Sequence, residues 1–153
     1  MSKSPSQDAL WAVVRGHRRA ILATVAPDGM PHLTNVHYLA DPRERLVRIT
    51  TTTTRVKGRN LLCDPRAVLH VQGDDWFTYA VAEGSVSCGV AEAPGDAAID
   101  ELHEIFTAFR GPQERPTFDE RMIAAHRMIV RLSVERLYGL IASSKAGTAA
   151  RAN

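Results

Sequence analysis

The residues best placed to do chemistry lie between Thr50 and Asn60. Five consecutive threonines, Thr50–Thr54, precede the basic segment Arg55-Val56-Lys57-Gly58-Arg59-Asn60. Hydroxyls, two or three cations and the expected start of a helix therefore lie within ten residues. Backbone N–H groups at a helix N-terminus favour an anion, and Arg and Lys add charge-assisted hydrogen bonds. This order of residue types predicts a binding site for a phosphate or a carboxylate.

Each half of this segment also has an ordinary structural interpretation. Threonine is a good strand former, so the threonine run could be a half-exposed strand end. The cations Arg55, Lys57 and Arg59 could be a solvated helix face. Because the two features follow each other directly, the hydroxyls of the strand end would lie beside the cations of the next helix. We therefore favour the anion site.

Two further groups of residues could contact a ligand. Asn35, Val36 and His37 lie on an expected strand, where a ring could stack, although their spacing alone fits ordinary strand residues. Trp76 and Phe77 follow a turn, and such residues are more often core or dimer-interface anchors than ligand stackers.

The histidine and cysteine spacing argues against a metal site. His32 and His37 are five residues apart and would point to opposite faces of a strand. Cys63 and Cys88 match no metal or redox spacing. The chain also has no Walker loop, no GxGxxG and no GxSxG sequence. We expect no metal, and no residue is assigned as a catalytic acid or base.

Composition is that of an ordinary globular protein. The chain has 153 residues, 44% hydrophobic and 24% charged, with a formal charge of +2. We expect one domain, 1–153, with loose termini at 1–6 and 142–153. The small net charge does not indicate nucleic-acid binding, and no apolar run reaches the roughly 20 residues of a membrane span. Without a signal-peptide pattern, we expect a cytoplasmic protein.

Alternating apolar runs and turn residues predict six strands and four helices. The strands are expected at Arg19–Ala26, Pro31–Ala40, Arg45–Thr53, Ala67–Gln72, Trp76–Ser87 and Arg127–Leu137. The helices are expected at Gln7–Arg15, Arg55–Cys63, Ala97–Phe109 and Phe118–Met128. Five hairpin-like strands, a helical insertion and a last strand predict a mainly β (α+β) fold, a six-stranded antiparallel barrel rather than βαβ units.

Three stretches in order resemble a known family. AILATVAPDGMPHLTNVHYLAD is followed by RLVRITTTTTRVKGRNLLCDPRAVLHV and then by WFTYAVAEGSV. This order resembles the split-barrel flavin-binding superfamily of pyridoxamine 5′-phosphate oxidase, and most of all its branch that uses the deazaflavin coenzyme F420. The resemblance covers about residues 7–141. Its most specific element is Thr-x-x-Arg-x-Lys-x-x-Asn-Leu followed by Asp-Pro-Arg, which is Thr52–Arg66 here.

The resemblance implies which residues hold the cofactor. The third strand and the next helix would hold its phosphate, the second strand would line its ring system, and a second subunit would complete the pocket. The implied cofactor-binding set is Asn35, Val36, His37, Thr50, Thr51, Thr52, Arg55, Lys57, Gly58, Asn60, Trp76 and Phe77. Trp76, Phe77 and the Tyr138–Ile141 segment are the candidates for contribution across a dimer interface.

The resemblance also implies a function. We expect a homodimeric oxidoreductase that transfers a hydride from reduced coenzyme F420 to a small conjugated organic acceptor, with His37 as the proposed near-ring proton donor. An FMN-dependent reductase or oxidase, and a non-catalytic flavin- or deazaflavin-binding protein, remain open. The C-terminal RLYGLIASSKAGTAARAN lacks the arginine- and tryptophan-bearing segment that closes on pyridoxal phosphate in true pyridoxamine oxidases. Vitamin B6 oxidation is therefore not expected.

Overall fold

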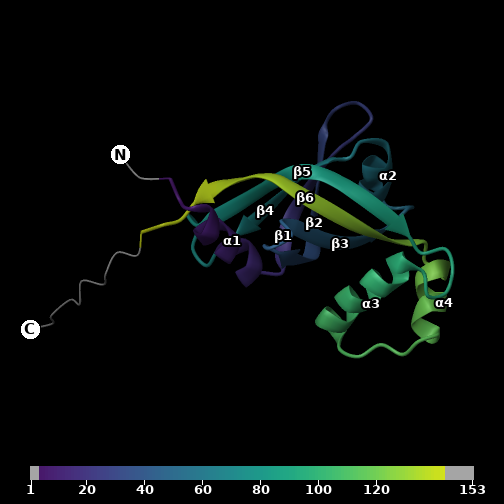
Figure 1. Ribbon diagram of the computed structural model, residues 1–153. Helices are drawn as coiled ribbons and strands as arrows, with labels where there is room; N and C mark the ends of the chain where they lie inside the picture. The colour runs from purple at the N-terminus through teal and green to yellow at the C-terminus, as the bar shows by residue number, and fades with distance from the viewer. Residues whose placement is uncertain (1–3, 144–153) are drawn as a thin grey trace, which may run out of the picture.

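The computed structural model describes residues 4–143 of the chain (Figure 1). Its elements are α1 (Gln7–Gly16), β1 (Arg19–Val25), β2 (Pro31–Asp41), β3 (Leu46–Thr52), α2 (Val56–Cys63), β4 (Arg66–Gln72), β5 (Tyr79–Val90), α3 (Ala97–Arg110), α4 (Thr117–Ala124) and β6 (Arg127–Leu140). The predicted loose termini lie mostly outside the described residues. Ser6, the last residue of the predicted loose N-terminus, is described: its hydroxyl caps α1 by accepting a hydrogen bond from the Ala9 N–H at 3.2 Å.

The six strands form a closed antiparallel barrel in the order β1-β2-β3-β6-β5-β4. Consecutive strands β1, β2 and β3 pair as hairpins, as do β4 and β5. The last strand, β6, enters between β3 and β5 and closes the barrel. The predicted six-stranded antiparallel barrel is confirmed.

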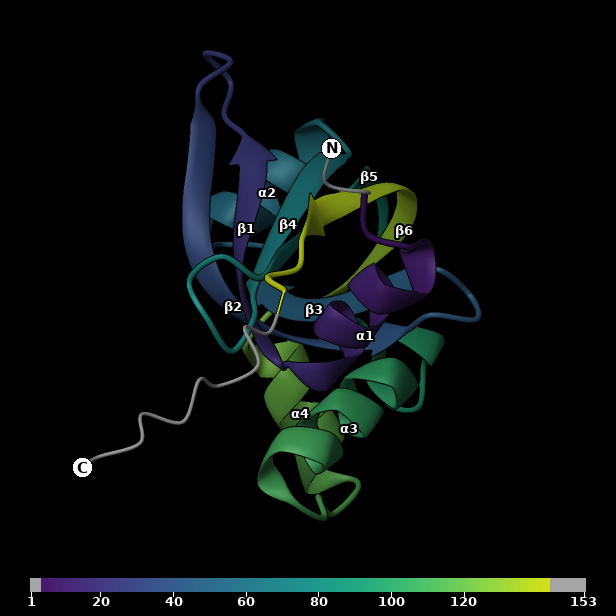
Figure 2. The same ribbon diagram turned by 90° about the vertical axis from the view of Figure 1, so that its left-hand side faces the viewer.

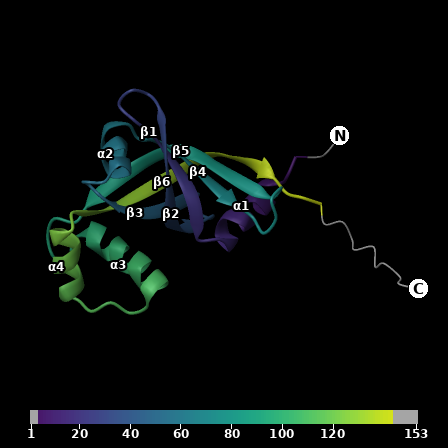
Figure 3. The same ribbon diagram turned by 180° about the vertical axis from the view of Figure 1, so that it is seen from behind.

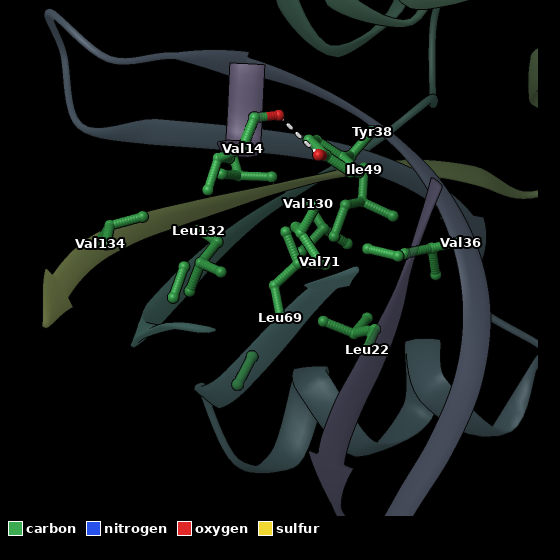
Figure 4. Packing of buried hydrophobic residues seen from close by; sticks show 14 of the residues in the cluster. Val14, Leu22, Val36, Tyr38, Ile49, Leu69, Val71, Val130, Leu132 and Val134 are labelled. Carbon is green, nitrogen blue, oxygen red and sulfur yellow. Dashed lines mark hydrogen bonds between the residues drawn. The ribbon is translucent and has the colours of Figure 1, made fainter. Parts of the chain in front are cut away.

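The barrel interior is filled by alternate residues of the strands, because successive side chains of a strand point to opposite faces. On β6, Met128, Val130, Leu132 and Val134 are buried in this core, as their alternation predicted. Figure 4 shows Val130 and Leu132 of β6 among the side chains of the other strands. Helix α1 packs Leu10, Trp11 and Val14 into the same core.

The helices lie at different parts of the barrel. In Figures 1 and 3, α1 lies near one end, whereas α2 and the α3–α4 pair lie toward the other. Figure 2 shows α3 and α4 together outside the barrel. They form a second core in which Leu102, Ile105 and Phe118 pack with the outward-facing Ile129 of β6. Within residues 4–143, no helix combines the length and the apolar content that crossing a membrane requires.

Ion pairs join α3 to the barrel wall. Arg131 of β6 contacts both carboxylate oxygens of Glu101, with its Nε at 2.7 and 3.0 Å. Arg48 of β3 donates to Glu104 at 2.7 Å. Because both arginines are on the outward side of their strands, these pairs align α3 over β3 and β6.

Four predicted boundaries are wrong by three residues or more, among them the ends of β5 and β6, which reach Val90 and Leu140 instead of Ser87 and Leu137. The strand expected from Trp76 begins at Tyr79, because the Asp75 carboxylate accepts hydrogen bonds from the N–H groups of Phe77 and Thr78 and holds a turn there. The helix expected to reach Met128 ends at Ala124, because His126 adopts a left-handed φ of 51°. The chain is then redirected into β6 at Arg127.

Replacing Tyr38 by Phe should destabilise the fold. The buried Tyr38 hydroxyl donates to the Val14 carbonyl at 2.6 Å, a contact that Figure 4 shows. Val14 lies in the last turn of α1, where carbonyls lack helical partners. Burial raises the pKa of Tyr38, so the group stays a neutral donor. We expect Tyr38→Phe to lower the free energy of unfolding by about 1–2 kcal/mol in urea titration.

Tyr79→Phe is the matched control, because Tyr79 lies on the strand end outside the barrel core. Equal urea midpoints for the two variants would contradict a stabilising role of the Tyr38 hydroxyl.

Candidate functional site

A pocket of about 370 Å³ lies outside the barrel, between β2, β3 and helix α3. We call it the cationic pocket. Its lining residues are Asn35, Val36, His37, Thr50, Arg55, Lys57, Ile105, Phe106, Phe109, Arg110 and Arg127. Six of them belong to the predicted cofactor-binding set. The structure therefore brings together the second strand, the threonine strand and the basic helix start, as the sequence indicated.

Thr50 faces this pocket because of its place on β3. Ile49 and Thr51 are buried on the inward side of the strand, so Thr50 between them faces outward. Its Oγ1 atom is itself shielded from solvent and has no hydrogen-bond partner in the protein. A buried hydroxyl without a partner is unfavourable, and a ligand atom in the pocket could satisfy it.

Arg55 and Lys57 enter the pocket at the start of α2. Arg55 is the N-cap residue, and no side chain there accepts a hydrogen bond from the helix. The first N–H groups of a helix have no intrahelical partner. Their positive partial charge adds to the two side-chain charges. The N-terminus of α2 is thus suited to binding an anion.

Gly58 allows α2 to pack against the end of β3. A Cβ atom at this position would lie 2.0 Å from the Thr52 carbonyl oxygen, which is backbone and cannot move aside. Any other residue would push the helix away from the strand. Gly58 therefore sets the distance between Thr50 and the cations of α2, rather than lining the pocket itself.

Four cations surround the pocket without a carboxylate to neutralise them. Arg55, Lys57, Arg110 and Arg127 form no salt bridge within residues 4–143. Burial, and then the charges of Arg55 and Arg127, lower the pKa of Lys57. The pKa of Arg127 is also lowered, first by burial and then by the charges of Arg55, Arg110 and Arg121. Burial is the larger cause of both shifts, and repulsion among the like charges adds to it; a bound anion would relieve that repulsion.

Helix α3 forms the apolar wall of the pocket. Phe109 meets the His37 ring edge-on, with ring centroids 5.1 Å apart. The guanidinium groups of Arg110 and Arg127 lie 5.5 and 5.4 Å from the centre of the Phe106 ring. The cations are therefore held on an aromatic surface. Sequence reasoning assigned α3 only as a helix with an apolar stripe, and missed that its Phe106–Arg110 end borders the site.

Several predicted residues lie elsewhere. The side chains of Thr51 and Thr52 are buried, and the Thr52 hydroxyl pairs with that of Thr54 at 3.0 Å. Asn60 is also buried, and its Nδ2 donates to the Thr24 hydroxyl at 3.1 Å, which ties α2 to β1. Their side chains support the site from behind instead of lining it.

Trp76 and Phe77 are not core residues. They are 81% and 64% exposed in the turn before β5, and neither lines the cationic pocket. The core interpretation of these two side chains is wrong, since the Asp75 turn projects them into solvent. Their predicted role at a dimer interface stays a prediction.

The residues present fit a phosphate-bearing cofactor. An unpartnered Thr50 hydroxyl, an open helix N-terminus and unneutralised cations are the donors that a phosphate needs. The aromatic wall of α3 opposite Asn35–His37 could cover a flat ring. Among residues 4–143, no three histidine, cysteine or acidic side chains cluster as they would around a metal ion.

Comparison with known proteins gives matches over most of the chain. A family model described as pyridoxamine 5′-phosphate oxidase matches residues 6–140. An F420H2-dependent biliverdin reductase of Mycobacterium tuberculosis is 27% identical over 135 residues, which are 88% of this chain and 87% of that protein.

Solved structures give the same fold. An F420 reductase is 26% identical with a TM-score of 0.58, covering 78% of this chain and 88% of that one. A conserved hypothetical protein of Mycobacterium tuberculosis is 24% identical with a TM-score of 0.68, covering 96% and 99%. Because the family model spans nearly all the described residues, the chain belongs to the pyridoxamine 5′-phosphate oxidase family of split barrels, and it resembles the F420 branch of that superfamily.

Proposed function

We propose that this protein is an oxidoreductase that binds coenzyme F420 and passes a hydride to a small conjugated organic acceptor. The observation that carries the proposal is the cationic pocket. Within the described residues, its four cations have no carboxylate partner and the buried Thr50 hydroxyl has no hydrogen-bond partner. The likeness to an F420H2-dependent reductase and to an F420 reductase supports the same cofactor class.

The distribution of charge favours the deazaflavin over FMN. Arg55 and Lys57 lie at the start of α2, whereas Arg110 and Arg127 lie at the end of α3 and the start of β6. FMN carries its negative charge on one phosphate, which one pair of cations can bind. Coenzyme F420 adds an anionic lactyl-oligoglutamate tail, which gives the second pair a partner. FMN remains the alternative cofactor.

The chain's own residues would bind, orient and shield the cofactor. The phosphate would be held by the Thr50 hydroxyl, by Arg55 and Lys57, and by the first N–H groups of α2. The segment Asn35–His37 would lie under the ring, with Phe106 and its neighbours excluding water. When bound, the cofactor supplies the hydride chemistry. His37, held against Phe109, is the ring-side group that could move a proton.

We also propose a homodimer. Paired positions on the outer face of the barrel form a continuous row across five strands, Asn35, Ile21, His70, Val81 and Tyr138. Val81 is buried, but Ile21 and Tyr138 are exposed, and so are Leu33 and Leu140, which lie two positions along their strands from Asn35 and Tyr138 and so on the same face. Large exposed apolar surfaces mark interaction sites, and a two-fold homodimer is the commonest oligomer. A second copy on this face would lie beside the cofactor site.

Lys57→Ala and Arg55→Ala should weaken cofactor binding far more than folding. Each removes one charge-assisted contact, at about 1.5–3 kcal/mol of binding or roughly ten- to a hundredfold in Kd. The free energy of unfolding should change by no more than about 0.5 kcal/mol. Because the pKa of Lys57 is lowered partly by Arg55 and Arg127, its removal relieves repulsion. Fluorescence titration with F420 and with FMN, beside thermal melts, measures both effects.

Arg43→Ala is the control, because Arg43 is exposed in the β2–β3 turn, away from the pocket. If the Lys57 and Arg55 variants bind both cofactors like the parent, the proposed phosphate site is refuted. Tighter binding of FMN than of F420 would favour the alternative reductase or oxidase. Binding without turnover over a panel of conjugated acceptors would favour a non-catalytic binding protein.

Sedimentation velocity at micromolar concentration should show a dimer. Replacing Ile21 by Glu should shift it toward monomer, because a charge would be placed in the middle of the outer row. Arg43→Glu, in the β2–β3 turn, should leave the dimer intact. A monomeric parent that still binds cofactor tightly would contradict this proposal.

Exhaustive chelation should leave activity unchanged. The chain offers no clustered metal ligands within its described part, and hydride transfer from a deazaflavin needs no Lewis acid. Turnover of an accepted substrate before and after treatment with a chelator tests this expectation. Loss of turnover that one particular metal restores would refute it.

A further inference from the structure

A second pocket, of about 570 Å³, lies on the outer face of β1, β2 and β4. Its lining residues are Arg19, Ala20, Ile21, Asn35, Val36, His37, His70 and Gln72. Three of these, Asn35, Val36 and His37, also line the cationic pocket. The two pockets therefore meet along one short segment of β2, so that ligands in both would be neighbours.

The floor of the second pocket is flat and partly aromatic. Asn35, Ile21 and His70 lie directly opposite one another on adjacent strands, which places their side chains side by side. The His70 ring stacks on Tyr79, with centroids 5.5 Å apart and planes 15° from parallel. A planar molecule would find the Ile21 side chain and the His70 ring to lie on, with the Asn35 amide beside them.

The polar groups of this pocket select the charge of its ligand. No aspartate or glutamate lines it, and within residues 4–143 Arg19 forms no salt bridge. The Gln72 amide is already used, because its Nε2 donates to the Asp75 and Thr78 carbonyls at 2.7 and 2.9 Å. Arg19 is thus the charged group that remains to recognise a ligand, and its planar fork matches a carboxylate.

We propose that the second pocket is the acceptor site and that it takes a planar conjugated carboxylate, whose carboxylate pairs with Arg19 and whose flat body lies on Ile21 and His70. The acceptor role rests on the proposed function, whereas binding of the carboxylate does not. The shared Asn35–His37 segment places this ligand next to the ring side of the cationic pocket. A second copy on the outer row would enclose it, since Ile21 and His70 belong to that row.

Isothermal titration of the full chain with trans-cinnamate, a planar conjugated carboxylate, tests the proposal. The neutral cinnamamide should bind about tenfold more weakly or worse, and Arg19→Gln should weaken cinnamate binding by about tenfold, since one charge-assisted contact is lost in each case. Arg19→Lys, which keeps the charge but loses the planar fork, should restore only part of the affinity. Arg43→Gln, an exposed cation outside the pocket, should bind cinnamate like the parent.

The two pockets are separated by a second set of titrations. The Lys57→Ala variant should bind cinnamate with the affinity of the parent. The Arg19→Gln variant should bind F420 and FMN with the affinity of the parent. Cinnamate should also bind the parent in the presence of saturating cofactor. Any of three results would overturn the second site: competition between cinnamate and the cofactor, loss of cinnamate binding in Lys57→Ala, or cinnamate binding no tighter than that of cinnamamide. Arg19-dependent cinnamate binding by a protein that binds neither cofactor would support the carboxylate site while refuting the proposed function.

Discussion

The fold and the cationic pocket both depend on the insertion of β6 between β3 and β5. An open sheet would leave two edges of unpaired backbone groups, and β6 removes both by pairing along each side. Its alternation serves two cores at once, because Met128 and Val130 face the barrel interior while Ile129 faces α3. Its first residue, Arg127, then lies beside Thr52 and enters the pocket. Closure of the barrel thus also brings Arg127, the fourth cation, to the cationic pocket.

The pocket concentrates positive charge at some cost to the free protein. Burial, and then the neighbouring like charges, lower the pKa of Lys57 and of Arg127, so the charged forms of both groups are disfavoured. Elsewhere the cations beside α3 are neutralised, since Arg48 of β3 and Arg131 of β6 pair with glutamates of that helix. This contrast between the paired side and the unpaired end of α3 is the reason for proposing the pocket as a binding site rather than a surface cluster.

Local patterns predicted much of this arrangement. Alternating apolar runs predicted the strands of the barrel, including β6, and the threonine run followed by Arg55 and Lys57 led to the pocket. Two of the misplaced boundaries arose where local geometry overrides periodicity. Asp75 holds a turn in a stretch that alternates like a strand, and His126 breaks a helical pattern with a left-handed residue. Neither effect is visible in hydrophobic spacing.

The sequence by itself determined the order of strands and helices, the barrel class, and the threonine–arginine–lysine segment, because these follow from spacing between residues close in the chain. Tertiary structure alone decided which residues face the pocket. It buried Thr51 and Asn60 and exposed Trp76, because burial depends on what packs from elsewhere. It also brought Arg110 and Arg127 to Lys57 from more than fifty residues away. Charges so distant in sequence meet only when the barrel closes, so no local pattern could have paired them.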